Sequence, residues 1–324
     1  MIHPSNVIPP MSGLGDFCLS VHGSPKPFAD GLADQSRWPA LGQWHAPVDS
    51  IELWPGAQLL VRGCGSVRTA GRAGAWLLSI DSDHRREPEA VVAKWLAPKA
   101  SRTSPRLLDL SDVTARFVLI AWDAEDQTLV IATDAFRTYP VAHLTRRQSD
   151  SASFYAASDI RLLRRVYEAG EVDAQGPATN LVTDPKAIYH YLNFSFVPNE
   201  ACIWRDMSKL APGGLLRWSH ETGAATLDSW WDARYPEDHS GNESAMSTEL
   251  REQVMRSVHR YAQTDASHWG SFLSGGTDSS SISGILSAKR RELADQKVNS
   301  FSIGFAEPGY DELAYAKIAS DHFG

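Results

Sequence analysis

A short glycine-containing stretch, Ser271 to Ser281 (SFLSGGTDSSS), constrains the fold of this chain more than any other segment. Apolar residues lead into the pair Gly275 and Gly276, and small hydroxylated residues follow the pair. This order predicts a strand at Trp269 to Leu273, a tight turn, and a helix at Ser279 to Leu293, because apolar residues recur along the second segment at helical spacing. The stretch therefore indicates a strand-turn-helix unit.

The composition of the turn suits an anionic ligand. Gly275 and Gly276 lack Cβ atoms, so their backbone N–H groups can approach an anion closely, and the start of the helix adds unpaired donors. Ser274 and Ser279 add hydroxyl donors. Asp278 would repel a bare phosphate, but a divalent cation between its carboxylate and the phosphate oxygens removes the conflict. The turn therefore predicts Mg²⁺-nucleotide chemistry.

The complete string is more specific than a pair of glycines, which any strand-to-helix turn can carry. It lacks the lysine of a Walker loop and the G-x-G-x-x-G dinucleotide pattern. Ser274 to Ser279 instead resembles the S-G-G-x-D-S pyrophosphate loop of the ATP pyrophosphatase group. Phe301 to Phe305, Tyr310 to Glu312 and Ala316-Lys317 are similar to the next strand and helix of asparagine synthetases, so that family gives the closest resemblance.

Segments before the loop resemble the distal half of the glutaminase domain in the same family. They occur in the family's order, and the similarity spans roughly residues 110 to 324. The segments are Arg116 to Asp123, Ile131 to Asp134, Ala157 to Ile160, Asn193 to Pro198 and Lys209 to Gly214.

The resemblance implies an α/β chain with two domains. Residues 1–240 would form an α+β sandwich of the N-terminal nucleophile-hydrolase type, and residues 241–324 the first part of a doubly wound, parallel-sheet ATP pyrophosphatase domain. The boundary is placed near residue 240, within Tyr235 to Ser247, because this stretch is polar and poor in apolar residues, as inter-domain linkers are.

Local patterns add predictions within the first domain. Arg116 to Asp123 and Thr128 to Asp134 are short apolar runs that predict a hairpin. Residues 170 to 183 are interpreted as a loop. Asp184-Pro185 predicts the capped start of a helix that passes through Leu192.

Two features depart from the family pattern. A glutaminase of this type needs cysteine as its first mature residue, whereas Ile2 follows Met1 here and Cys18 lies far inside the sequence. We therefore expect a degenerate glutaminase-like domain without glutamine hydrolysis, a misassigned start codon being the alternative. The sequence also stops at Gly324, so the family's second glycine-rich segment and catalytic Lys and Glu lie outside it. We expect the 324-residue chain alone to complete no ligation.

For the site, the resemblance implies that Ser274, Gly275, Gly276, Asp278 and Ser279 hold the pyrophosphate of ATP, with Asp278 directed at Mg²⁺. Leu273 and Ile303 would touch the adenine, and the alternative is that both are ordinary core residues of their strands. No catalytic residue is assigned.

Three functions compete at this point. The first is an ATP-dependent amide ligase like glutamine-hydrolysing asparagine synthase, in which a carboxylate such as aspartate attacks the α-phosphorus, pyrophosphate leaves, and an amine attacks the acyl-adenylate. The second is an amide-forming cyclase like β-lactam synthetases and lasso-peptide cyclases, which use an internal amine and need no glutaminase. The third is a noncatalytic, truncated remnant.

Composition narrows the partners and the compartment. A formal net charge of −8 leaves no basic excess for binding nucleic acid. The three cysteines, Cys18, Cys64 and Cys202, form no metal-ligand or disulfide pattern, which favours a reducing cytoplasm. No signal peptide and no run of 18 apolar residues is found, so no membrane association is expected. The oligomeric state is not fixed by the sequence, and a homodimer is one option.

Overall fold

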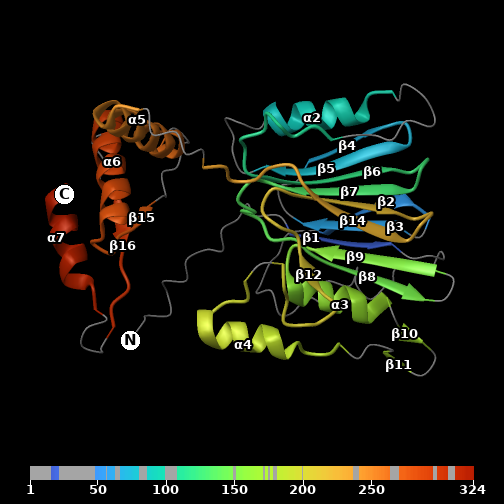
Figure 1. Ribbon diagram of the computed structural model, residues 1–324. Coiled ribbons are helices and arrows are strands. Elements are labelled where there is room, and N and C mark those ends of the chain that lie inside the picture. Colours follow the sequence, from blue (N-terminus) through green and yellow to red (C-terminus); the bar gives the residue numbers. More distant parts are fainter. Residues whose placement is uncertain are drawn as a thin grey trace. The chain divides into compact units, whose positions relative to one another are not determined.

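The computed structural model describes most of the chain (Figure 1). The described residues are 16–21, 48–55, 57–62, 66–79, 86–98, 108–148, 151–170, 172–173, 176–177, 181–198, 200–235, 241–262, 270–294, 298–305 and 311–324. The chain divides into two units, Met1–Arg234 and Tyr235–Gly324. The predicted domain limits at 1–240 and 241–324, and the identity of each domain, stay predictions.

The first unit contains two six-stranded sheets with antiparallel pairings. The first sheet has the order β12-β8-β9-β1-β3-β2 and consists of β12 (Ser208–Lys209), β8 (Ala142–Gln148), β9 (Ser151–Ala157), β1 (Asp16–Val21), β3 (Ala57–Arg62) and β2 (Val48–Trp54). The second has the order β14-β13-β7-β6-β5-β4 and consists of β14 (Ala224–Ser229), β13 (Gly214–Ser219), β7 (Thr128–Thr133), β6 (Phe117–Asp123), β5 (Ala73–Ser79) and β4 (Ser66–Ala70).

The two sheets lie face to face with a helix on each outer face (Figure 1). Leu19 and Phe154 of the first sheet share one buried cluster with Trp76 and Trp218 of the second. Helix α2 (Arg86–Leu96) packs on the outer face of the second sheet, and α3 (Ile160–Gly170) packs on the first. This four-layer arrangement of helix, sheet, sheet and helix confirms the predicted α/β fold class.

Strand β6 does not alternate between apolar and polar residues, because both of its faces are buried. All seven of its residues are buried. Val118, Ile120 and Trp122 enter the core between the sheets, whereas Phe117 and Leu119 enter the cluster beneath α2. A strand covered on both faces is expected to be a continuous apolar run. The predicted hairpin of β6 and β7 is confirmed, and the two strands pair from Val118↔Thr133 to Asp123↔Thr128.

A buried aspartate, Asp134, joins two segments that the sequence analysis had related only by resemblance. Asp134, 2% exposed, accepts hydrogen bonds from the backbone nitrogens of Phe117 (3.2 Å), Phe136 (2.9 Å) and Thr138 (3.1 Å). Its own carbonyl oxygen accepts from the Gly213 nitrogen at 2.9 Å. The end of β7 and the turn before β13 are therefore held together, because buried donors and acceptors need partners.

Two further predictions for the first unit have opposite outcomes. Helix α4 (Pro185–Phe194) begins as expected, since the Asp184 side chain accepts from the Lys186 nitrogen at 3.0 Å. The interpretation of residues 170 to 183 entirely as a loop is wrong. Two short antiparallel strands, β10 (Val172–Asp173) and β11 (Gly176–Pro177), pair there.

The second unit contains a parallel pair of strands and three helices. Strand β15 (Gly270–Phe272) pairs with β16 (Asn299–Phe301) in register from Gly270↔Asn299 to Phe272↔Phe301. The helices are α5 (Glu243–Ala262), α6 (Thr277–Ala294) and α7 (Leu313–Phe323). The predicted parallel pairing is confirmed.

Two details of the second unit differ from the sequence prediction. Residues 243–247 belong to α5 and not to a linker, because a mostly exposed helix tolerates polar residues throughout. Strand β16 ends at Phe301, so the residues up to Phe305 lie outside the strand.

Within the described ranges, none of the helices combines the length and the apolar character that a bilayer span requires.

Candidate functional site

The predicted phosphate loop connects β15 to α6, as the sequence indicates. Leu273 to Gly276 form the turn, and α6 begins at Thr277. The hydroxyls of Ser271 and Ser283, 2.8 Å apart and buried, bond the strand to the helix. The first-turn N–H groups of a helix have no intrahelical acceptor. The loop thus places a set of backbone donors at the positive end of α6.

Gly275 and Gly276 are required for different reasons. Gly275 has a φ of 83°, and a Cβ added there would overlap the Tyr315 backbone and lie 2.7 Å from the Ala316 nitrogen. Gly275 is therefore fixed by its conformation and by the close approach of α7. A Cβ on Gly276 would meet no atom closer than the Ser274 hydroxyl at 3.4 Å. The protein itself leaves the space beside Gly276 open, as an approaching ligand would require.

Ser274 and Ser279 form a small network that shapes the loop. Their hydroxyl oxygens lie 3.0 Å apart, and the Ser279 oxygen accepts from the Ser274 nitrogen at 3.2 Å. The Ser279 hydroxyl also lies 3.2 Å from the Gly276 carbonyl oxygen and donates to it. These bonds hold the turn in one conformation before any ligand binds, which reduces the ordering cost of binding.

Asp278 occupies the first turn of α6 and is exposed. Among the residues that the structure describes, no group of three or more His, Cys, Asp or Glu side chains could hold a metal ion. Mg²⁺ in nucleotide sites is commonly bound by one or two carboxylates together with substrate phosphates and water. One exposed carboxylate beside an open glycine face fits that mode of binding, in which the nucleotide supplies the other ligands.

The two residues expected at the adenine differ in accessibility. Leu273 is 3% exposed, its nitrogen donates to the Phe301 carbonyl at 2.9 Å, and its carbonyl accepts from the Ser302 hydroxyl at 2.6 Å. Its side chain therefore belongs to the core of the strand pair. Ile303 is 71% exposed and has an apolar surface that a base could cover. Their adenine contacts stay predictions, with Ile303 the more accessible of the two.

Candidate nucleophiles and bases in the first unit are desolvated. Cys202 is buried, and burial raises the pKa of its thiol to about 11. His143 lies inside the first unit, and burial lowers its pKa to about 4. Cys18 lies in the middle of β1, where its backbone pairs with Leu60 and Ala157. Cys64 lies outside the described residues. Neither Cys202 nor His143 is placed for chemistry on a solvent-borne substrate.

Sequence reasoning missed the residue that packs on the loop. Tyr315 comes from α7, 40 positions after Gly275, and no local pattern marks it. Gly284 was missed as well, although a Cβ there would lie 2.7 Å from the Phe323 ring of α7. A glycine within an otherwise helical segment was the signal for this close contact.

The two units match different sequence families. Residues 249–324 match the asparagine synthase family, and residues 109–231 match the glutamine amidotransferase domain family. The first match covers the loop from α5 onward, and the second covers β6 to β14. The first unit is thus similar to glutamine amidotransferase domains, and the second unit is similar to asparagine synthases.

Sequence comparison with individual proteins also finds asparagine synthetases. Asparagine synthetase (glutamine-hydrolyzing) 1 of Bacillus subtilis is 26% identical over 208 residues, which are 64% of this chain and 29% of that protein. A candidate asparagine synthetase (glutamine-hydrolyzing) 2 of Methanocaldococcus jannaschii is 51% identical over 55 residues, 17% of this chain and 10% of that protein. The two family matches and these relatives together support a likeness to the asparagine synthetase family. Its matched part spans less than a third of the length of these relatives.

A solved structure also resembles the chain at low similarity. The glutamine phosphoribosylpyrophosphate amidotransferase from B. subtilis, complexed with ADP and GMP, has a TM-score of 0.30 and 10% sequence identity. The match covers 91% of this chain and 61% of that one. At this TM-score the likeness adds nothing to the argument.

The different roles of the two loop glycines lead to a stability prediction. Gly275→Ala should lower the free energy of unfolding of the second unit by about 2 kcal/mol or more, because φ is positive and α7 blocks the added methyl group. Gly276→Ala should change it by less than about 0.5 kcal/mol. Pulse proteolysis in urea, with mass spectrometry of fragments from residues 235–324, measures both. Equal losses in the two variants would contradict this assignment.

Proposed function

We propose that this chain contributes the pyrophosphate-binding part of an ATP-dependent, AMP-forming amide ligase of the asparagine synthetase type. The family uses ATP and Mg²⁺. The observation that carries the proposal is the loop: an S-G-G-x-D-S turn between a parallel strand and a helix, with open space at Gly276. The carboxylate substrate would be aspartate or a related acid, and the amine donor would be glutamine or ammonia.

In this proposal the loop acts on the leaving group. The N–H groups at the start of α6, the Gly276 nitrogen and the Ser274 and Ser279 hydroxyls would bind the β- and γ-phosphates. Asp278 would hold Mg²⁺ against the same oxygens. Negative charge accumulates on pyrophosphate as its bond to the α-phosphorus breaks, and fixed donors that match this charge stabilise the transition state.

The two alternative functions differ from this proposal in different ways: the cyclase in its source of the amine, and the noncatalytic module in its lack of nucleotide binding. An amide-forming cyclase shares the activation step and takes its amine from the substrate itself. The burial of Cys202 supports it, because that thiol offers no reactive thiolate for releasing ammonia from glutamine. A noncatalytic module would differ at the loop, where it would show no saturable binding of Mg²⁺-nucleotide.

Asp278 gives the proposal a two-sided test. With Mg²⁺ present, Asp278→Asn should weaken pyrophosphate binding about 10-fold or more, because a charged ligand of the bridging cation is lost. With EDTA, the same variant should bind pyrophosphate at least as well as the parent, because the repulsion between carboxylate and phosphate is removed. Titration calorimetry on the full chain measures both affinities.

A matched control for this titration is Asp321→Asn, which removes an exposed carboxylate of α7 that pairs with Lys317 at 2.9 Å. It should leave both affinities unchanged. An Asp278→Asn variant with the parent affinity in Mg²⁺ would remove Asp278 from the site. Absence of any saturable binding to the parent would favour the noncatalytic alternative.

We also propose that the chain does not hydrolyse glutamine. The buried Cys202 thiol, with its pKa raised to about 11, stays protonated at neutral pH and is a poor nucleophile. Incubation with glutamine and enzymatic assay of glutamate should give no release above a buffer blank. Release that disappears in Cys18→Ala or Cys202→Ala would overturn the proposal and identify the nucleophile.

A further inference from the structure

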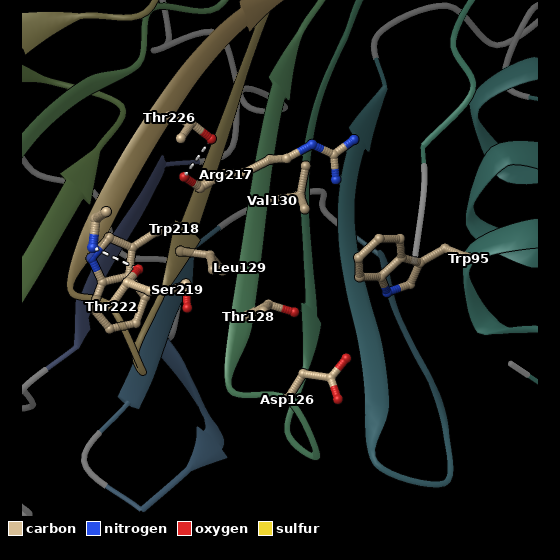
Figure 2. Close-up of a pocket in the computed structure, with 11 residues that line it drawn as sticks. Trp95, Asp126, Thr128, Leu129, Val130, Arg217, Trp218, Ser219, Thr222 and Thr226 are labelled. Atoms are coloured by element: carbon tan, nitrogen blue, oxygen red, sulfur yellow. Dashed lines mark hydrogen bonds between the residues drawn. The ribbon is translucent and has the colours of Figure 1, made fainter. Parts of the chain in front are cut away.

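The first unit has a groove of about 240 Å³ on the outer face of its second sheet, beside α2 (Figure 2). Its lining includes Val130 of β7, Arg217 of β13 and Thr226 of β14. The Thr226 hydroxyl donates to the Arg217 carbonyl oxygen at 3.5 Å, as the dashed line in Figure 2 shows. Because this hydroxyl is already used within the sheet, the groove does not indicate a ligand, in contrast to the open turn at Gly276.

Ser302 bonds to the residue that leads into this turn. Strand β15 ends at Phe272, and Leu273 follows it. The Leu273 nitrogen donates to the Phe301 carbonyl at 2.9 Å, and the Leu273 carbonyl oxygen accepts from the Ser302 hydroxyl at 2.6 Å. Leu273 is 3% exposed, so water is a poor substitute for that hydroxyl. Ser302 therefore holds the last carbonyl group before the loop.

The peptide group between Leu273 and Ser274 is held at both of its polar atoms. Ser302, which follows β16, holds the carbonyl oxygen, and the Ser274 nitrogen donates to the Ser279 hydroxyl of α6 at 3.2 Å. A peptide group is planar, so holding its oxygen and its N–H fixes the orientation of the whole plane. Two serine hydroxyls on opposite sides thus set the direction in which the chain enters the loop.

This direction determines where the Ser274 side chain lies. The Ser274 hydroxyl oxygen is 3.0 Å from that of Ser279, and it accepts from the Gly276 nitrogen at 3.4 Å. Without the bond from Ser302, only the Ser279 bond would orient the peptide plane. The plane could then rotate about the line between its Cα atoms, and Ser274 would lose its fixed position relative to α6.

We propose that Ser302 is a positioning residue for phosphate binding. The inference rests on the proposed function, in which the Ser274 and Ser279 hydroxyls and the Gly276 nitrogen bind the β- and γ-phosphates. Ser302 acts through the peptide between Leu273 and Ser274 and not by contact with phosphate. A support that holds the binding groups in place before the ligand arrives lowers the ordering cost of binding.

Titration calorimetry of the full chain with Mg²⁺-pyrophosphate tests this role. Ser302→Ala should weaken binding about 5-fold, the equivalent of one ordinary hydrogen bond. Ser302→Thr keeps the hydroxyl and should bind with the parent affinity. Ser302 is exposed, so both variants are expected to fold.

Ser283→Ala is the matched control. It removes a buried hydroxyl that lies 2.8 Å from that of Ser271 and joins the same strand to the same helix. It should lower the stability of the second unit without changing the affinity for pyrophosphate, because this bond does not involve the peptide held by Ser302. In the free protein, hydrogen–deuterium exchange at residues 270–276 should be faster in Ser302→Ala, while exchange in α5 stays the same.

The outcomes separate this inference from the proposed function. Parent affinity in Ser302→Ala, no recovery in Ser302→Thr, or an equal loss in Ser283→Ala would overturn the inference and leave the proposed function in place. Faster exchange in α5 as well as in the loop would also overturn it, because Ser302 would then serve stability alone. Absence of saturable binding to the parent would overturn the proposed function, and this inference with it.

Discussion

The backbone of α7 approaches Gly275 so closely that a single methyl group would not fit, and the rest of the second unit depends on this contact. Gly275 also has a left-handed φ of 83°, in the turn that leads from β15 into α6. Ser279 then closes the turn through its bonds to Ser274 and Gly276. Because α7 covers one side of the loop, the side at Gly276 is the one left for a ligand. The packing constraint and the proposed binding surface thus lie at adjacent glycines.

The first unit depends on a different constraint, the burial of both faces of its central strands. Val118 and Phe117 of β6 enter separate cores, so β6 needs apolar side chains on both sides. Asp134 then satisfies backbone nitrogens where β6 begins and just after β7 ends. Toward β14 the second sheet leaves its outer face polar, and Arg217 and Thr226 meet there. This change from a covered to an open face creates the groove.

Local patterns in the sequence predicted a large part of the fold. The β6–β7 hairpin, the Asp184 cap and the strand-turn-helix around Gly275 each depend on neighbouring residues, and all three are present. Helix α2 was not predicted, since its charged residues obscure the short apolar set of Val91, Val92 and Trp95.

What the sequence could not predict depends on register between distant strands. Edge strand β14 (AATLDS) is half polar and gives no apolar alternation. The groove requires Val130, Arg217 and Thr226 to align across three strands, and no spacing along the chain encodes that alignment. Within the loop the residue types were predictable, but the separate reasons for Gly275 and Gly276 appear only when α7 is placed against them.

Hydrogen–deuterium exchange on the full chain, with and without Mg²⁺-pyrophosphate, tests the central claim most directly. If the loop is the binding site, slower exchange should be confined to peptides that contain residues 274–281, because ligand oxygens would accept from the N–H groups at the start of α6. Peptides from β6 and β7 should exchange at the same rate in both conditions. Unchanged exchange at residues 274–281 at saturating ligand, or protection only in the first unit, would contradict the account.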